Sequence, residues 1–238
     1  MRLAGRVAVV TGAGRGIGRA IAAAVVREGA SVVLAARSAA EIEAVAREIR
    51  QGGGRALVVP TDVRQEAAVE ALVRRALGEW QRVDLLVNAA GVATFAPVTD
   101  SKLDDWDQML AVNLRGAVLC CRAVLPAMIV QHRGTIINIG SVVTSRSLTG
   151  SAAYTASKYG LLGFSRVLAE EMRAHGVRVG VLSAGATDTP LWDATSGAPA
   201  RERMLRADQV AEAALLMAAL DPNATLEEMT LLPAGGIL

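Results

Sequence analysis

Several residue types that carry common chemistries are scarce in this 238-residue sequence. It holds only two histidines and two cysteines, and aromatic residues make up 3%. His132 and His175 each lie one or two residues before a glycine where a helix is expected to end, a place where the helix dipole favours such a side chain. Cys120 and Cys121 are adjacent, which favours two buried, reduced thiols. A histidine-based catalyst, a metal site and a disulfide framework are therefore disfavoured, and Ser-His-Asp hydrolysis is weakened further because no G-x-S-x-G elbow is present.

Neither the charge nor the hydropathy of the chain points to nucleic acid or membrane. The formal net charge is +2, with no concentrated basic face of the kind that nucleic acid requires. The apolar stretch 116–130 is shorter than the roughly 18 residues of a membrane span and is interrupted by Arg122 and Pro126. The apolar run 7–10 is too short for a signal peptide. We therefore expect a soluble, cytoplasmic protein.

The hydrophobic residues, 52% of the chain, alternate between two patterns. Short runs rich in Val, Ile and Leu predict strands buried on both faces at 6–10, 31–35, 56–59, 83–87, 135–139, 177–182 and 229–231. Helical periodicity lies between them at 17–28, 40–51, 66–79, 103–131, 152–175 and 207–220. Natural left-handed helix caps are expected at Gly29, Gly52, Gly134 and Gly176. The alternation predicts one α/β domain over residues 1–238, a doubly wound parallel sheet with helices on both faces.

A glycine-rich stretch, TGAGRGIG at residues 11–18, follows the first strand and opens the first helix. It matches neither the G-x-G-x-x-G dinucleotide fingerprint nor the P-loop pattern. In this position, however, backbone N–H groups and the positive end of a helix converge, which favours an anion such as a dinucleotide pyrophosphate. Four glycines within seven positions are more than a ligand-free turn needs, so we predict that this loop binds a ligand.

Read as T-G-x-x-x-G-x-G, with Thr11, Gly12, Gly16 and Gly18, the loop resembles the cofactor loop of the short-chain dehydrogenase/reductases. Other motifs of that family follow in order, most of them at expected strand ends: TDV at 61–63, NAAG at 88–91, VNL with Asn113, Ser141, YTASK at 154–158 and AGATDT at 184–189. The resemblance covers nearly the whole chain. It implies a Rossmann fold with seven parallel strands in the order 3-2-1-4-5-6-7 and a ligand site at their carboxyl ends.

The chemistry would centre on Tyr154 and Lys158, which project from the same face of a helix because they are four residues apart. A nearby ammonium and an oxidised nicotinamide would lower the phenol pKa from near 10 by about 1 to 3 units. Tyr154 would then serve as general acid or general base. The resemblance implies that Ser141 holds the substrate oxygen, that Lys158 also binds the nicotinamide ribose, and that Asn113 holds a water linking Lys158 to solvent.

The end of the second strand predicts NADP(H) rather than NAD(H). Ala36 stands where NAD-dependent members usually have an acid, and Arg37 follows it, with Arg15 as a second cation for a 2′-phosphate. The alternative is that Arg37 only begins a solvated helix cap before Ser38. The resemblance implies no metal and the following cofactor contacts: Gly12, Arg15, Gly16, Ile17, Gly18, Arg37, Ser38, Asp62, Val63, Asn88, Ala89, Gly91, Tyr154, Lys158, Gly185, Thr187 and Thr189.

The substrate is less well specified. Segment 189–207 is expected to form a lid, with apolar candidates at Leu191, Trp192, Met204 and Leu205 and basic residues at Arg201, Arg203 and Arg206. A small or medium carbonyl compound fits this lid. A carrier-bound acyl group is the alternative, in which the arginines would contact an acidic carrier. The same residues are equally compatible with ordinary packing and a solvated basic turn that have no role in substrate binding. The resemblance also implies a homotetramer that pairs through the helices at 103–131 and 152–175. The alternative function is a non-catalytic dinucleotide-binding redox sensor, against which Tyr154 and Lys158 at catalytic spacing argue.

Overall fold

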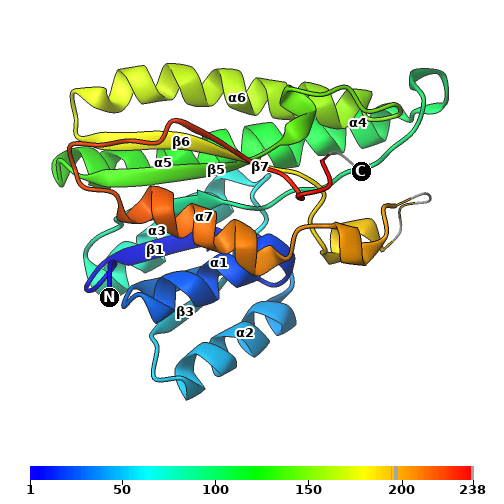
Figure 1. Cartoon of the computed structure of the whole chain (residues 1–238). Helices are drawn as coiled ribbons and strands as arrows, with labels where there is room; N and C mark the ends of the chain where they lie inside the picture. The colour runs from blue at the N-terminus through cyan, green and yellow to red at the C-terminus, as the bar shows by residue number, and fades with distance from the viewer. Residues whose placement is uncertain (194, 196–197, 237–238) are drawn as a thin grey trace.

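A seven-stranded parallel sheet organises the protein, as the computed structural model describes it over residues 1–193, 195 and 198–236 (Figure 1). The strand order is β3-β2-β1-β4-β5-β6-β7, and every pairing is parallel. The strands are β1 Val7–Thr11, β2 Ser31–Ala36, β3 Ala56–Pro60, β4 Leu85–Asn88, β5 Gly134–Ser141, β6 Val177–Ala184 and β7 Glu228–Leu231. The predicted fold class and strand order are confirmed. The boundaries differ from the prediction by at most two residues: β4 begins two residues later, and β5 and β6 end two residues later.

Helices cover both faces of the sheet (Figure 1). They are α1 Gly16–Arg27, α2 Ala39–Gln51, α3 Glu66–Trp80, α4 Leu103–Met109, α5 Gly116–Val130, α6 Ala152–Arg173 and α7 Ala207–Ala219. Successive strand residues point to opposite faces, so Ala8 and Val10 pack into a core with α1, α2 and α7, whereas Val9 packs into a second core with α3, α5 and α6. This two-sided burial explains why the strands are continuously apolar.

The long helix predicted at 103–131 is one continuous helix with an irregular centre. Between α4 and α5 the backbone forms a π-helical segment, Leu110–Arg115. By length and composition alone, the 28-residue run Leu103–Val130 is long and apolar enough to cross a membrane, because it extends well beyond the stretch 116–130. In the fold, half of its most apolar window is buried, and α5 packs against α3 and against β4 and β5.

Two of the four predicted helix caps are wrong. Gly29 and Gly176 have positive φ values of 89° and 69°, as predicted. Gly52 has a φ of −78°, and the left-handed residue after α2 is its neighbour Gly53. Gly134 is the first residue of β5; after α5 the left-handed conformation is adopted by His132, at φ 48°. His132 is therefore part of the turn itself rather than a side chain ahead of a glycine cap.

Candidate active site

A cleft of about 690 Å³ lies at the carboxyl ends of the strands. Its walls come from the glycine loop after β1, the loop after β4, the end of β5, the start of α6 and the segment after β6. Of the residues predicted as catalytic or cofactor-binding, the cleft is lined by Gly12, Arg15, Gly16, Ile17, Gly18, Arg37, Ser38, Asp62, Val63, Ala89, Gly91, Ser141, Tyr154, Lys158, Gly185, Thr187 and Thr189. Asn88 and Asn113 lie behind this wall, around a small interior space that Lys158 also borders.

The glycine loop is packed so closely that side chains would not fit. Gly12 has a φ of +65°, and a Cβ there would stand 2.8 Å from the backbone of Ala89. A Cβ at Gly16, with φ +54°, would stand 3.0 Å from Thr189 on the opposite wall. Helix α1 begins here without a side-chain cap, so its first N–H groups have no side-chain acceptor. The loop thus presents backbone donors to the cleft at close range.

Thr11 joins the glycine loop to the NAAG turn, a role that the motif alone did not reveal. Its hydroxyl oxygen accepts hydrogen bonds of 3.2 Å from the N–H groups of both Ala89 and Ala90 and donates to the carbonyl of Val87. The side chain of Asn88 points the other way: its amide donates to Oδ1 of the buried Asn138 at 2.8 Å. Asn88 therefore ties β4 to β5, and only its backbone can face a cofactor.

Both arginines predicted for a 2′-phosphate lie at one end of the cleft. Arg15 and Arg37 are exposed, and neither forms an ion pair with a carboxylate among the described residues. Asp62 is bound instead by Arg64 at 2.6 Å, and this hydrogen bond holds the pKa of Asp62 below its usual range. Sequence reasoning missed Glu41, which lines the cleft from the first turn of α2. Its carboxylate adds one negative charge where the strand end alone predicted none.

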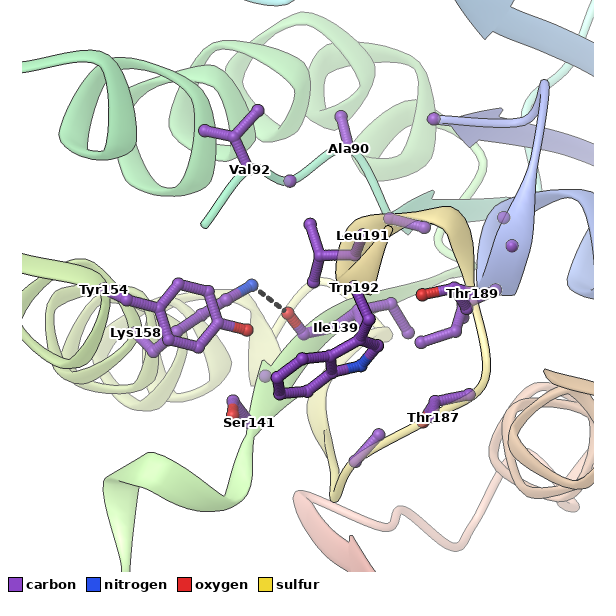
Figure 2. A pocket seen from close by; sticks show the side chains of 18 of the residues that line it. Ala90, Val92, Ile139, Ser141, Tyr154, Lys158, Thr187, Thr189, Leu191 and Trp192 are labelled. Atoms are coloured by element: carbon purple, nitrogen blue, oxygen red, sulfur yellow. Dashed lines mark hydrogen bonds between the residues drawn. The ribbon is translucent and has the colours of Figure 1, made fainter. Parts of the chain in front are cut away.

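Tyr154 and Lys158 extend from α6 toward the end of β5, where Ser141 and Ile139 lie (Figure 2). The Nζ atom of Lys158 donates to the carbonyl of Ile139 at 2.8 Å and stands 5.6 Å from the centre of the Tyr154 ring. Lys158 is buried, and this burial lowers the pKa of its ammonium from 10.5 to about 8. The spacing of four residues thus brings the pair to one place in the cleft.

The sequence predicted that the pKa of Tyr154 is lowered, and this is wrong when only the protein's own groups act on the phenol. Burial raises the pKa of the phenol, and a hydrogen bond with Ser141 opposes this only in part. The reason is that removal from water disfavours the phenolate, while the ammonium of Lys158 is directed at the Ile139 carbonyl. At neutral pH the phenol therefore keeps its proton.

Asn113 lies in the π-helical segment and connects three parts of the site. Its Nδ2 donates to the carbonyl of Val92 at 2.9 Å and to Oγ of Ser157 at 3.0 Å, while its Oδ1 accepts from the Val92 N–H at 2.9 Å. Ser157 in turn donates to the carbonyl of Tyr154. Both amide hydrogens are thus used within the protein, and the predicted water would have to bind the remaining lone pair of Oδ1 or the main chain.

Segment 189–207 is divided between the cleft and the core, and residues 194, 196 and 197 of it lie outside the described residues. Leu191 and Trp192 line the cleft, but Met204 and Leu205 are buried elsewhere. Arg201 pairs with Asp188 and Asp193, both at 2.7 Å. Arg206 pairs with Asp208 at 3.0 Å. These internal pairs weaken the idea of an arginine surface for an acidic carrier.

Phe95, in the loop after β4, is a cleft residue that sequence reasoning missed. Its ring stacks on Trp192 with centroids 5.7 Å apart and planes 6° apart. The same ring lies 6.0 Å from that of Tyr154 at an angle of 54°. No periodicity marks this loop, so only its aromatic character in an aromatic-poor chain could have drawn attention to it.

Comparison with known proteins gives a consistent result. The profile of the family described as short chain dehydrogenase matches residues 6–199. D-threitol dehydrogenase of Mycolicibacterium smegmatis is 38% identical, with 99% of this chain and 94% of that protein covered. A metagenomic short-chain oxidoreductase solved in complex with NADP is 39% identical, with a TM-score of 0.87 over 98% of this chain and 99% of that chain. An alcohol dehydrogenase from the archaeon Thermococcus sibiricus, complexed with 5-hydroxy-NADP, is 30% identical, with a TM-score of 0.89 over 96% and 97%.

Proposed function

The chain belongs to the short-chain dehydrogenase family and is an oxidoreductase that acts on CH–OH groups with NAD(P); on that premise we propose that it prefers NADP(H) and interconverts a carbonyl compound and its alcohol with Tyr154 as general acid and base. The observation that carries the proposal is the meeting of Tyr154, Lys158 and Ser141 in one cleft with the glycine loop. These groups come from separate segments, and the fold brings them together at one sheet edge.

The residues of the cleft fit a dinucleotide. The side-chain-free surface at Gly12 and Gly16 and the uncapped start of α1 would hold the pyrophosphate. Arg15 and Arg37 would mark the adenosine end, and Thr187 and Thr189 line the cleft from the segment after β6. When bound, the nicotinamide supplies or accepts the hydride, and the protein's own contribution is alignment and proton transfer.

Tyr154 would hold the proton that the substrate oxygen needs. In the direction of reduction the raised pKa keeps the phenol protonated, so that Tyr154 can donate to the oxygen as negative charge develops there. Ser141, beside it at the end of β5, would donate a second hydrogen bond to the same oxygen. In the direction of oxidation the phenol must first lose its proton, so we expect this rate to rise with pH. Lys158 would favour the phenolate at pH values below about 8, where its ammonium is charged.

The preference for NADP(H) rests on the charge at the adenosine end. Arg15 and Arg37 supply two cations without carboxylate partners among the described residues, whereas Asp62 is neutralised by Arg64. The carboxylate of Glu41 offsets one of these two positive charges. The net charge of these side chains stays positive, which favours a 2′-phosphate over a hydroxyl. The NADP complexes of the two related structures agree with this preference.

The relatives named as threitol and alcohol dehydrogenases support a small, free alcohol or carbonyl compound as substrate rather than a carrier-bound one.

We also propose a cytoplasmic homotetramer. Its basis is the exposed apolar surface on α6, where Tyr159 and Val167 are 52% and 59% exposed. Light scattering at micromolar concentration tests this, and a monomer alone would refute the tetramer.

The function is tested by following NADPH absorbance with a panel of ketones, aldehydes and 3-oxoacyl thioesters, and NADP⁺ reduction with alcohols. We expect turnover with a free carbonyl compound and a kcat/KM for NADPH at least tenfold above that for NADH, from about 1.4 kcal/mol of added binding to the 2′-phosphate. A tenfold preference for NADH would overturn the cofactor assignment. NADPH binding without turnover of any compound would instead favour a redox sensor.

A further inference from the structure

Aromatic side chains gather at the catalytic end of the cleft. The chain has three Trp, two Tyr and two Phe, and three of these seven meet here: Phe95, Tyr154 and Trp192. The stacked pair of Phe95 and Trp192 and the tilted pair of Phe95 and Tyr154 form one continuous group of rings. In a chain with so few aromatics, this group is a specific feature of the site.

The surface around these rings is apolar. Figure 2 shows Leu191 and Trp192 on the segment that faces Tyr154 and Ser141 across the cleft, and Val92 lies on the loop after β4. Other apolar residues that line the cleft are Val143, Leu148, Leu232 and Pro233. The polar side chains here include Ser141, Tyr154 and Lys158, which the reaction would use, and Arg146 and Ser147 on the exposed turn 145–149. Thr187 and Thr189, on the segment that leads to Trp192, also line the cleft, and the hydroxyl of Thr187 already donates to the carbonyl of Gly185. A substrate hydroxyl away from the reacting carbon therefore has few partners inside.

Trp192 is held in place by the segment that carries it. Arg201 donates to Oδ1 of Asp188 and of Asp193 at 2.7 Å and to the carbonyl of Thr189 at 2.8 Å. One guanidinium therefore binds the chain both before and after Trp192. A parallel bridge between Thr187 and Leu205 closes the base of the segment. The ring of Trp192 is thus positioned for recognition before a substrate arrives.

We propose that the substrate carries a planar aromatic group next to its reacting carbon, as in an aryl ketone or a benzylic alcohol. This inference rests on the proposed function and specifies its substrate class. Rings pack favourably against rings in offset or edge-to-face geometry, which a saturated group does not reproduce. A polyhydroxy compound would instead leave hydroxyl groups without partners against Val92, Leu191 and the rings, which is costly.

The experiment compares three ketones with NADPH: an aryl methyl ketone, its cyclohexyl counterpart of similar size, and a four-carbon polyhydroxy ketone. We expect kcat/KM for the aryl ketone to exceed that of the polyhydroxy ketone by at least about tenfold and that of the cyclohexyl ketone by several-fold. Trp192→Leu and Phe95→Leu should each remove most of the preference for aryl over cyclohexyl, whereas Trp192→Phe should restore it. Trp80→Phe, at the end of α3 and not among the cleft residues, is the control and should change nothing.

Binding without turnover separates this inference from the proposed function. The aryl ketone should raise the Tm of the NADP⁺-bound wild type but not of Trp192→Leu. If the polyhydroxy ketone is reduced best and the aryl ketone shifts no Tm, the aromatic site is refuted and the oxidoreductase stands. If no ketone is reduced, the proposed function fails; a Tm shift that depends on Trp192 would then still support an aromatic ligand, and its absence would refute that too.

Discussion

The two edges of the sheet compared here are the one where the strands begin and the one where they end, and they differ in whether polar groups have partners within the protein. At the edge where strands begin, the buried Asp84 accepts from the N–H of Val7 at 2.9 Å and from two nitrogens of Arg82, at 2.6 and 2.8 Å. Nearby, Arg178 donates to Thr135 and to three carbonyls after α7, those of Leu220, Asp221 and Ala224. Strong polar groups at this edge are matched by partners within the protein.

At the other end, where the strands stop, three cations that line the cleft lack such partners. Among the described residues, Lys158 is buried beside one carbonyl and pairs with no carboxylate, and Arg15 and Arg37 form no ion pair. Helix α1 starts there without a side-chain cap. The difference indicates that one edge stabilises the fold while the other keeps its binding capacity for a ligand, at some expense of stability.

Lys158→Met should change turnover and stability together, in opposite directions. Without the ammonium we expect turnover to fall about 10²- to 10³-fold. At the same time the free protein should become more stable at pH 7, by about 2 kcal/mol, because a buried charge is removed and only one hydrogen bond is lost. Steady-state kinetics and thermal unfolding without cofactor measure the two effects.

The pH dependence of that stability gain follows from the pKa of Lys158. The folded protein releases the proton above about 8, whereas the unfolded chain keeps it until about 10.5. Between these values the unfolded state binds more protons, so wild-type stability rises with pH. The advantage of Lys158→Met is therefore full below pH 8 and fades toward pH 10.5. A variant less stable than the wild type at pH 7 would contradict this account.

Asp84→Ala should lower stability and leave turnover nearly unchanged, which is the reverse of what we expect for Lys158→Met. Loss of the acceptor for the buried N–H of Val7 and for Arg82 should cost about 2 to 3 kcal/mol in the free energy of unfolding. Turnover per folded molecule should stay within twofold, because the residue lies at the other edge. Glu70→Ala, which removes an exposed pair with Arg74, is the matched control and should cost less than about 0.5 kcal/mol. Equal costs for the two variants would remove the basis for calling the Asp84 edge stabilising.

The smallest effects are expected at the adenosine end, where two variants should act in opposite directions. Arg37→Ala should lower kcat/KM for NADPH by about 10- to 100-fold and leave that for NADH nearly unchanged. Glu41→Gln should raise the value for NADPH two- to threefold, since it removes a carboxylate from the end of the cleft where a 2′-phosphate would bind. If Arg37→Ala lowered kcat/KM for NADPH and for NADH equally, the guanidinium would be a structural cap and not a phosphate ligand.

The sequence predicted what depends on buried strands and on motifs at their ends. The strand order follows from the family resemblance, and Tyr154 and Lys158 meet because helical spacing brings them to one face. Glu41 was missed because it enters the cleft from the first turn of α2, beyond the strand end where the acid was sought. Phe95 was missed because a loop without periodicity gives no direction to its side chains. The sign of the Tyr154 shift depends on burial, which spacing alone does not reveal.

The central claim is that Tyr154 transfers the proton and that the rest of the cleft binds the cofactor independently of it. The most direct test measures both quantities in Tyr154→Phe: the turnover of a carbonyl substrate and the Kd for NADPH. We predict that turnover falls about 10²- to 10⁴-fold while the Kd stays within about twofold. Turnover within a few-fold of the wild type, or loss of NADPH binding along with activity, would contradict the claim.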